Sequence, residues 1–237
     1  ISDKSVKEDK QIFLEHGKPM IFGKNRDKGL VLNKLKLEVV TIGEKPTLAI
    51  NNPAASMRMA MAEALTNMVS APIVGMDQIQ VSANWMAASG ENIEDLALRK
   101  GVEALSNFST DLGISIPVGK DSLSMRTKWQ ENNDQYVVKS PLSGVITAMA
   151  PVDDVRDAVT TLLKTDIDSQ LVLIKLNDKN RLGGSIFSEA YKQDVQETPD
   201  VDNAELFIKM FDLTQSLIQE GFEENLIEEI LQKTIMK

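Results

Sequence analysis

The sequence has no cysteine and only one histidine among its 237 residues. The lack of cysteine excludes disulfides, thiolate zinc sites and a cysteine nucleophile. His16 alone cannot form a histidine-based metal site, and no pattern brings it to a serine as a catalytic triad requires. Any metal bound by this chain is therefore expected to be a hard cation held by oxygen ligands.

Long apolar runs and an excess of positive charge are also missing. No stretch approaches the roughly 18 apolar residues of a membrane span, and the amino-terminal residues do not resemble a signal peptide. We therefore expect a cytoplasmic protein with no membrane partner. The formal net charge of −9 argues against nucleic acid as a partner, because binding to its phosphates depends on clustered Lys and Arg.

The 42% hydrophobic composition is enough for a sizeable core, and the length predicts two domains. Residues 1–45 are charged, weakly periodic and interrupted by glycine and proline, which is typical of an arm or linker. We expect a first domain over residues 46–165 and a second, partial one over residues 166–237.

Alternating strands and amphipathic helices predict the α+β class. Two helices have clear start signals: Asn52 can cap a helix with Pro53 at its first position, ending near Met68, and another begins near Asn92 and stops at Gly113. The predicted strands are Thr47–Asn51, Ile79–Trp85, Ile114–Val118, Ser122–Trp129, Tyr136–Ala150 and Gln170–Leu176. Two further helices are predicted, one opening at Gly183 and Gly184 and one over Ala204–Gln219.

Glu63 and Asn67 are one helical turn apart and therefore share a face of the helix that follows Pro53. A carboxylate and an amide oxygen at this spacing are suitable ligands for Mg²⁺, which keeps water molecules that nucleotide phosphates can replace. From spacing alone, a solvated helix face is the more economical interpretation.

The tract Gly119-Lys120-Asp121-Ser122 resembles the end of a phosphate-binding P-loop but lacks its spacing and its following helix. Lys120 can still meet a phosphate as a point charge, with Asp121 near a cation; a charged turn between strands is the competing interpretation. Gly183-Gly184-Ser185, ahead of a predicted helix, can present backbone N–H groups to a phosphate or form a simple turn.

Several tracts, in this order and spacing, resemble the second synthetase repeat of large-type phosphoribosylformylglycinamidine synthase. They are Asn52-Pro53-Ala54-Ala55-Ser56, Glu63-Ala64-Leu65-Thr66-Asn67, Ser82-Ala83-Asn84-Trp85-Met86-Ala87-Ala88, Ile116 to Met125, Ser140-Pro141-Leu142-Ser143 and Leu182-Gly183-Gly184-Ser185. The likeness runs from about Ile42 to Gly221.

The resemblance implies the fold of the aminoimidazole ribonucleotide (AIR) synthetase superfamily, with an α+β amino-terminal domain and part of an α+β carboxy-terminal domain. It implies an ATP-dependent ligase that converts formylglycinamide ribonucleotide and ammonia to formylglycinamidine ribonucleotide, ADP and phosphate in purine biosynthesis. Mg²⁺ and ATP or ADP are the implied cofactors, with Glu63 and Asn67 as metal ligands. The implied wall of the nucleotide or substrate cleft comprises Asn84, Lys120, Asp121, Ser122, Gly183, Gly184 and Ser185.

The partners implied by the resemblance are the other synthetase repeat and a glutaminase domain, whose cysteine nucleophile this sequence lacks. The chain is therefore interpreted as a fragment of the ligase that associates with itself through its amino-terminal sheet. The alternative is a pseudo-symmetric half that holds a nucleotide structurally without turnover. A selenophosphate synthetase or a hydrogenase-maturation protein of the same superfamily is a third alternative, against which the tract Ser82 to Ala88 argues.

Overall fold

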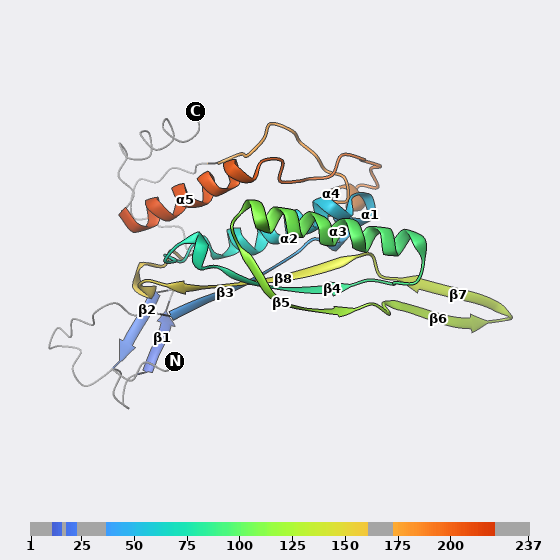
Figure 1. Cartoon of the computed structure of the whole chain (residues 1–237), viewed down its shortest axis with the longest axis horizontal. Helices are drawn as coiled ribbons and strands as arrows, with labels where there is room; N and C mark the ends of the chain where they lie inside the picture. Colours follow the sequence, from blue (N-terminus) through green and yellow to red (C-terminus); the bar gives the residue numbers. More distant parts are fainter. Residues whose placement is uncertain (1–10, 16–17, 23–36, 161–172, 221–237) are drawn as a thin grey trace.

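The computed structural model describes residues 11–15, 18–22, 37–160 and 173–220. Its centre is a four-stranded sheet in the order β3-β8-β4-β5 (Figure 1). The strands of this sheet are β3 (Leu37–Glu44), β4 (Gln80–Met86), β5 (Ser115–Ser122) and β8 (Ser143–Val152). Strand β8 is antiparallel to both of its neighbours, whereas β4 and β5 run parallel.

Two long helices cover one face of this sheet (Figure 1). They are α2 (Pro53–Met68) and α3 (Asn92–Asp111), and α5 (Ala204–Glu220) lies over them as a further layer. Shorter elements complete the described chain: α1 (Pro46–Asn51), α4 (Ile186–Ala190), and the 3₁₀ turns Met76–Gln78 and Val155–Asp157. The α+β class predicted from the sequence is confirmed.

Two separate hairpins flank the sheet. One is formed by β1 (Gln11–Glu15) and β2 (Lys18–Phe22), and the other by β6 (Arg126–Glu131) and β7 (Asp134–Lys139). The β6–β7 hairpin projects beyond the end of the helices (Figure 1), and its Trp129 and Tyr136 stack across the strands with ring centroids 5.3 Å apart. Ion pairs from Lys139 and Arg126 to Glu91 connect its base to the start of α3.

The core lies between α2 and the sheet. Met57, Met61 and Met68 are buried on α2, against strand residues such as Ile146 and Val81. Helix α5 is held to the loop after α2 by Gln215, whose amide accepts from the Ile73 N–H (3.0 Å) and donates to the carbonyl oxygen atoms of Val69 and Ala71. These three methionines belong to the core, where their flexible side chains can fill irregular space.

Local start and stop signals predicted the helices well. Asn52 caps α2, with its side chain accepting from the Ala55 N–H (3.1 Å), and Pro53 is the first helical residue. Helix α3 begins at Asn92, and Gly113 follows it with a φ of 69°, in the left-handed region that glycine adopts most easily.

Several predictions about strands need correction. The predicted strands Ser122–Trp129 and Tyr136–Ala150 are each interrupted, the second near Pro141, which has no N–H to donate, so their parts belong to the central sheet and to the β6–β7 hairpin. Thr47–Asn51 lies in helix α1, because Pro46 can begin a helix and a short apolar run does not distinguish the two structures. Residues 37–44, within the predicted arm, form an edge strand of the sheet paired with β8. The predicted strand Gln170–Leu176 lies partly outside the described residues, and residues 173–176 form no strand. The division between residues 46–165 and 166–237 stays a prediction.

Within the described residues, no helix is both long enough and apolar enough to cross a membrane. His16 lies outside the described residues.

Candidate functional site

Helix α2 packs closely against strand β3. A Cβ atom added to Gly43 would lie 2.0 Å from the Ala60 carbonyl oxygen, so only glycine fits there. The Thr41 hydroxyl donates to the Ala64 carbonyl oxygen (2.7 Å), and the Asn67 amide nitrogen donates to the Ile42 carbonyl oxygen (2.9 Å). This close approach brings the end of β3 alongside the middle of α2.

The Glu63 side chain is held by Glu44 and Lys45, the two residues that follow Gly43. Its Oε2 accepts a hydrogen bond from the Glu44 N–H (2.7 Å), and its Oε1 forms an ion pair with the Lys45 ammonium. The side chains of Lys45 and Glu63 are 33% and 30% exposed, so the pair remains in contact with solvent. The Asn67 amide nitrogen is already used by β3, which leaves its oxygen as the acceptor for another partner.

A cavity of about 600 Å³ opens beside these residues. Its lining comes from three parts of the chain: the end of β3 with α2, the irregular segment 173–203, here called the strap, and α5. The lining residues are Lys45, Met59, Ala62, Glu63, Thr66, Asn67, Ile174, Leu176, Asn177, Lys179, Arg181, Pro199, Asp200, Val201, Phe207 and Met210. The volume is in the range of small-molecule and cofactor sites.

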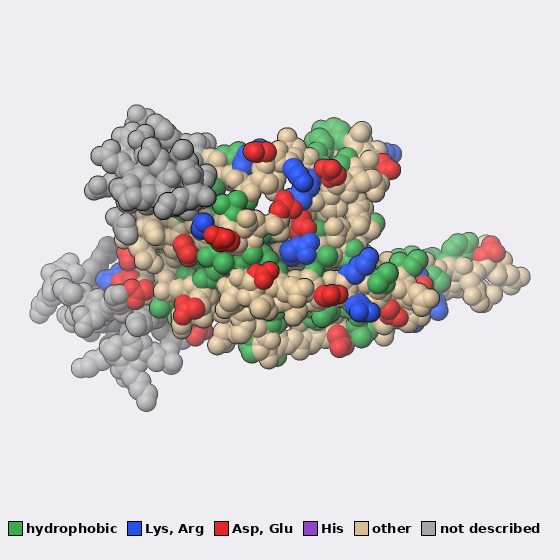
Figure 2. All heavy atoms as spheres, turned by 45° about the horizontal axis from the view of Figure 1, so that its top comes forward, with side chains coloured by type: hydrophobic (Ala, Val, Ile, Leu, Met, Phe, Trp, Pro, Cys, Tyr) green, Lys and Arg blue, Asp and Glu red, His purple; other side chains and the backbone are tan. Residues whose placement is uncertain are grey.

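The charged lining residues have both signs. Lys45, Lys179 and Arg181 supply three cations, whereas Glu63 and Asp200 supply two carboxylates. Figure 2 shows Lys and Arg side chains mixed with Asp and Glu where the strap meets the helices. Lys and Arg side chains beside the oxygen atoms of Glu63 and Asn67 could together bind a polyphosphate and its divalent cation.

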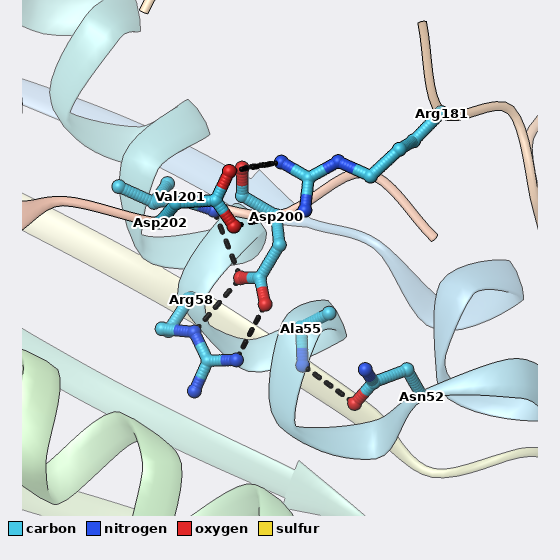
Figure 3. A network of polar contacts seen from close by, with 7 residues as sticks. All are labelled: Asn52, Ala55, Arg58, Arg181, Asp200, Val201 and Asp202. Carbon is cyan, nitrogen blue, oxygen red and sulfur yellow. Dashed lines mark hydrogen bonds and ion pairs between the residues drawn. The ribbon is translucent and has the colours of Figure 1, made fainter. Parts of the chain in front are cut away.

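One ion pair joins the strap to α2, and a second connects two parts of the strap itself (Figure 3). Arg58 of α2 donates from Nε to Oδ1 of Asp200 (2.8 Å) and from Nη2 to Oδ2 (2.5 Å). Arg181 binds both carboxylate oxygens of Asp202 (2.9 and 2.6 Å) and the Asp200 carbonyl oxygen (3.0 Å). The hydrogen bond to Asp200 holds the pKa of Arg58 above its usual value, so the guanidinium stays charged.

The residues fit a cation that brings other ligands with it. Glu63 and Asn67 offer two oxygen donors on one face of α2, as their spacing predicts. In the described part of the chain, no group of three or more Asp, Glu, His or Cys side chains could hold a metal ion. A bound Mg²⁺ would therefore need water and nucleotide phosphates for its remaining ligands, and it would neutralise phosphate charge there.

The other predicted site residues do not line this cavity. Asn84 of β4 is the register partner of Lys120 on β5, and the Lys120 ammonium donates to the Ser122 hydroxyl (2.9 Å). Asn84, Lys120 and Ser122 alternate along their strands on the face of the sheet away from α2, and Lys120 and Asp121 are exposed. This polar cluster is therefore separate from Glu63 and Asn67.

Gly183, Gly184 and Ser185 occupy a third place, next to α1. A Cβ atom on Gly183 would lie 2.4 Å from the Val195 carbonyl oxygen, and Gly184 has a φ of 73° with the Thr47 carbonyl oxygen 2.9 Å from where its Cβ would be. Ser185 caps the short helix α4 by accepting from the Ser188 N–H (3.2 Å). In this structure the glycines allow close backbone packing of the strap.

Sequence reasoning missed the cations of the cavity and its outer wall. Lys45, Lys179, Arg181 and Asp200 lie in irregular segments, where no periodicity marks them. The pair Arg58–Asp200 joins residues 142 positions apart. Only an expectation that the carboxy-terminal segment folds back on α2 could have identified them.

Comparison with known proteins points to one family. The sequence model of the FGAR-AT PurM_N-like domain matches residues 30–151. Among solved structures, Thermotoga maritima PurL complexed with FGAR is similar with a TM-score of 0.51 at 10% identity, covering 80% of this chain and 28% of that chain. The phosphoribosylformylglycinamidine synthase II of Thermotoga maritima has a TM-score of 0.43 at 12% identity, with 78% and 25% covered.

The chain thus spans little more than a quarter of the length of the PurL structure, and at 10% identity that likeness shows the fold alone. The family match covers just over half of the chain and includes β3, α2, α3 and the whole central sheet. The resemblance stated from the sequence motifs is confirmed: the chain belongs to the FGAR-AT PurM_N-like domain family.

Proposed function

We propose that the chain forms a nucleotide-binding part of an ATP-dependent carbon–nitrogen ligase, phosphoribosylformylglycinamidine synthase, of purine biosynthesis. The reaction would consume formylglycinamide ribonucleotide, ATP and ammonia and give formylglycinamidine ribonucleotide, ADP and phosphate. The observation that carries the proposal is the cavity between α2 and the strap, where Glu63 and Asn67 lie beside Lys45, Lys179 and Arg181.

The proposed roles follow from the chemistry of these side chains. Glu63 and the Asn67 oxygen bind the Mg²⁺ that accompanies the nucleotide, and the three cations balance phosphate charge that the metal leaves. The apolar lining residues Ile174, Leu176 and Phe207 offer a surface for the base or sugar. Asn84, Lys120, Asp121 and Ser122 are proposed as a wall for the second substrate, because Lys120 can meet its phosphate.

Titration calorimetry of ADP into the purified chain tests this proposal, first with Mg²⁺ and then with EDTA in its place. We expect Mg²⁺-dependent binding of ADP. The affinity should fall about tenfold or more in Glu63→Gln combined with Asn67→Ala, since even the loss of a residue that only supports a metal ligand typically lowers metal affinity by this factor. Glu44→Gln is the matched control, because it removes a neighbouring exposed charge but keeps the backbone N–H that holds Glu63. Equal ADP affinity in the double variant and in the control would refute the site.

A second function is favoured by one observation. Both carboxylates that line the cavity already have cationic partners, Glu63 with Lys45 and Asp200 with Arg58. A nucleotide held structurally, without turnover, needs no free base and suits this arrangement. Phosphate release in the presence of ATP, ammonia and formylglycinamide ribonucleotide separates the two functions, because only the ligase consumes ATP.

The proposal also includes partners for the open face of the sheet. Val40, Ile42 and Val118 are 57%, 54% and 58% exposed on the face away from α2. Val40 and Ile42 lie on one edge strand and Val118 on the other, so large apolar side chains are exposed at both edges of this face. Exposed apolar surface of this kind marks association sites. We propose a second synthetase repeat or a second copy of this chain as its partner, with ammonia supplied by a glutaminase domain.

A further inference from the structure

The ion pair between Lys45 and Glu63 occupies the carboxylate that a cation would need. Oε1 of Glu63 meets the Lys45 ammonium, and Oε2 accepts from the Glu44 N–H (2.7 Å). The N–H contact can remain when a metal binds, since a carboxylate oxygen has two acceptor positions. The ammonium cannot remain at Oε1, because two positive centres around one oxygen repel each other strongly.

The backbone of Lys45 is held in place, whereas its side chain can move the ammonium away from Glu63. The Lys45 carbonyl oxygen accepts from the Ser56 hydroxyl (2.6 Å) and from the Leu48 N–H (3.2 Å), which anchors the main chain between β3 and α1. Its side chain is one-third exposed and lines the same cavity as Lys179 and Arg181. A lysine stem with four rotatable bonds can therefore carry the charge from Glu63 to another anion in the cavity.

We propose that Lys45 is an exchangeable counter-ion: it neutralises Glu63 when no metal is present, yields the carboxylate to a divalent cation, and then pairs with a phosphate of the bound nucleotide. This inference rests on the proposed function, because it assigns the nucleotide to the same cavity. Lys45 lowers affinity for metal alone and raises affinity for phosphate, so it favours the joint binding of metal and nucleotide.

The test replaces Lys45 with methionine, which keeps most of the stem and removes the charge. Binding of Mn²⁺ alone is measured from the electron paramagnetic resonance signal of the free ion, and binding of ADP alone is measured by calorimetry in EDTA. We expect Lys45→Met to raise Mn²⁺ affinity about two- to fivefold, the scale of an ion pair that is one-third exposed. We expect it to lower ADP affinity without metal about threefold or more.

Two variants serve as controls. Lys209→Met removes a lysine that pairs with Glu205 on α5 and does not line the cavity, and it should change neither affinity. Glu63→Gln combined with Lys45→Met should show no gain in Mn²⁺ affinity over Glu63→Gln alone, because the carboxylate for which Lys45 and Mn²⁺ compete is then absent. Lys45→Gln replaces Lys45→Met if far-ultraviolet circular dichroism shows that the latter is misfolded.

Unchanged or weaker Mn²⁺ binding in Lys45→Met would overturn the exchange, as would an absence of Mn²⁺ binding in every variant. A gain in Mn²⁺ affinity with unchanged ADP affinity would overturn the transfer of Lys45 to phosphate. The Mn²⁺ measurement needs no nucleotide, so it decides the competition for Glu63 even if the wild-type chain fails to bind ADP and the proposed function is wrong.

Discussion

The two faces of the central sheet differ in what lies against them. The face toward α2 carries small and branched apolar residues such as Val81, Ala83 and Ile146, which are at most 2% exposed. The opposite face carries Val40, Ile42 and Val118, each more than half exposed, and none of the described elements covers it (Figure 1). One face is buried in the core, and the other leaves large apolar side chains exposed.

The same difference separates the polar residues that the sequence predicted for the site. Glu63 and Lys120 both looked like candidates in the sequence. Glu63 lies on α2 under a second layer, the strap and α5, and this layer encloses a cavity with opposed charges. Lys120 lies on the open face, where its nearest hydrogen-bond partner is its own neighbour Ser122. Electrostatic interactions are stronger where solvent is partly excluded, so the two positions are not equivalent.

The largest expected effect comes from adding a side-chain atom where β3 packs against α2. In Gly43→Ala, the new Cβ would meet the backbone of Ala60 at 2.0 Å and that of Ala64 at 2.5 Å, and helix backbone cannot give way as a side chain can. We expect the free energy of unfolding to fall by about 3 kcal/mol, at the upper end for overpacking. Urea unfolding followed by circular dichroism measures it.

Val40→Ala on the same strand is the control, because its side chain is 57% exposed on the open face. A loss below about 1 kcal/mol is expected, since little apolar surface is removed from the protein interior. If both variants lost the same stability, the contrast between the two faces would be wrong.

The sequence predicted those parts of the site that depend on local rules. The Asn52 cap fixes where α2 begins, and the four-residue step then places Glu63 and Asn67 on one face, where both line the cavity. It failed at α1, because residues 47–51 are too few to show a period, and at β3, because an edge strand with charged neighbours resembles a linker.

The remainder of the site depends on contacts between distant segments. Lys45 meets Glu63 only because Gly43 lets β3 approach α2, and Asp200 meets Arg58 across 142 residues of chain. Neither contact leaves a periodic mark in the sequence. Gly183 and Gly184 did stand out in the sequence. Glycines allow close backbone packing and positive φ in a phosphate-binding loop and in a tight turn alike, so they could not distinguish the two.

A second prediction concerns the open face. Ile42→Lys places a charge on this face, on the edge strand β3, and should weaken self-association of the chain at least about tenfold, or about 1.4 kcal/mol, because the charge must be desolvated at an interface. Light scattering over micromolar concentrations measures it. Ile93→Lys on α3 is the matched control, since Ile93 is 80% exposed and lies away from the sheet. A wild-type chain that is monomeric throughout would contradict the association.

The smallest expected effect compares the ion pair that joins the strap to α2 with the one inside the strap. Asp200 and Arg58 have side chains 13% and 26% exposed, whereas Asp202, the partner of Arg181, is 44% exposed. Asp200→Asn removes a carboxylate that is itself largely shielded and should lower the free energy of unfolding by about 1 kcal/mol. Asp202→Asn should cost at most about half as much, because Asp202 is the exposed partner and Arg181, 11% exposed, keeps the Asp200 carbonyl oxygen as an acceptor. Urea unfolding of the two variants gives the values.

The same pair of variants shows whether the strap is a wall of the cavity or only a neighbour of it. Asp200 lines the cavity and fixes the Val201 N–H, so its loss should also weaken Mg²⁺-dependent ADP binding, while the outward-facing Asp202 should matter less. Proteolysis of residues 173–203, followed by mass spectrometry, should be faster in Asp200→Asn and slowed again by ADP with Mg²⁺. Equal cleavage and equal ADP affinity in the two variants would mean that the Arg58–Asp200 pair does not hold the strap in place over the cavity.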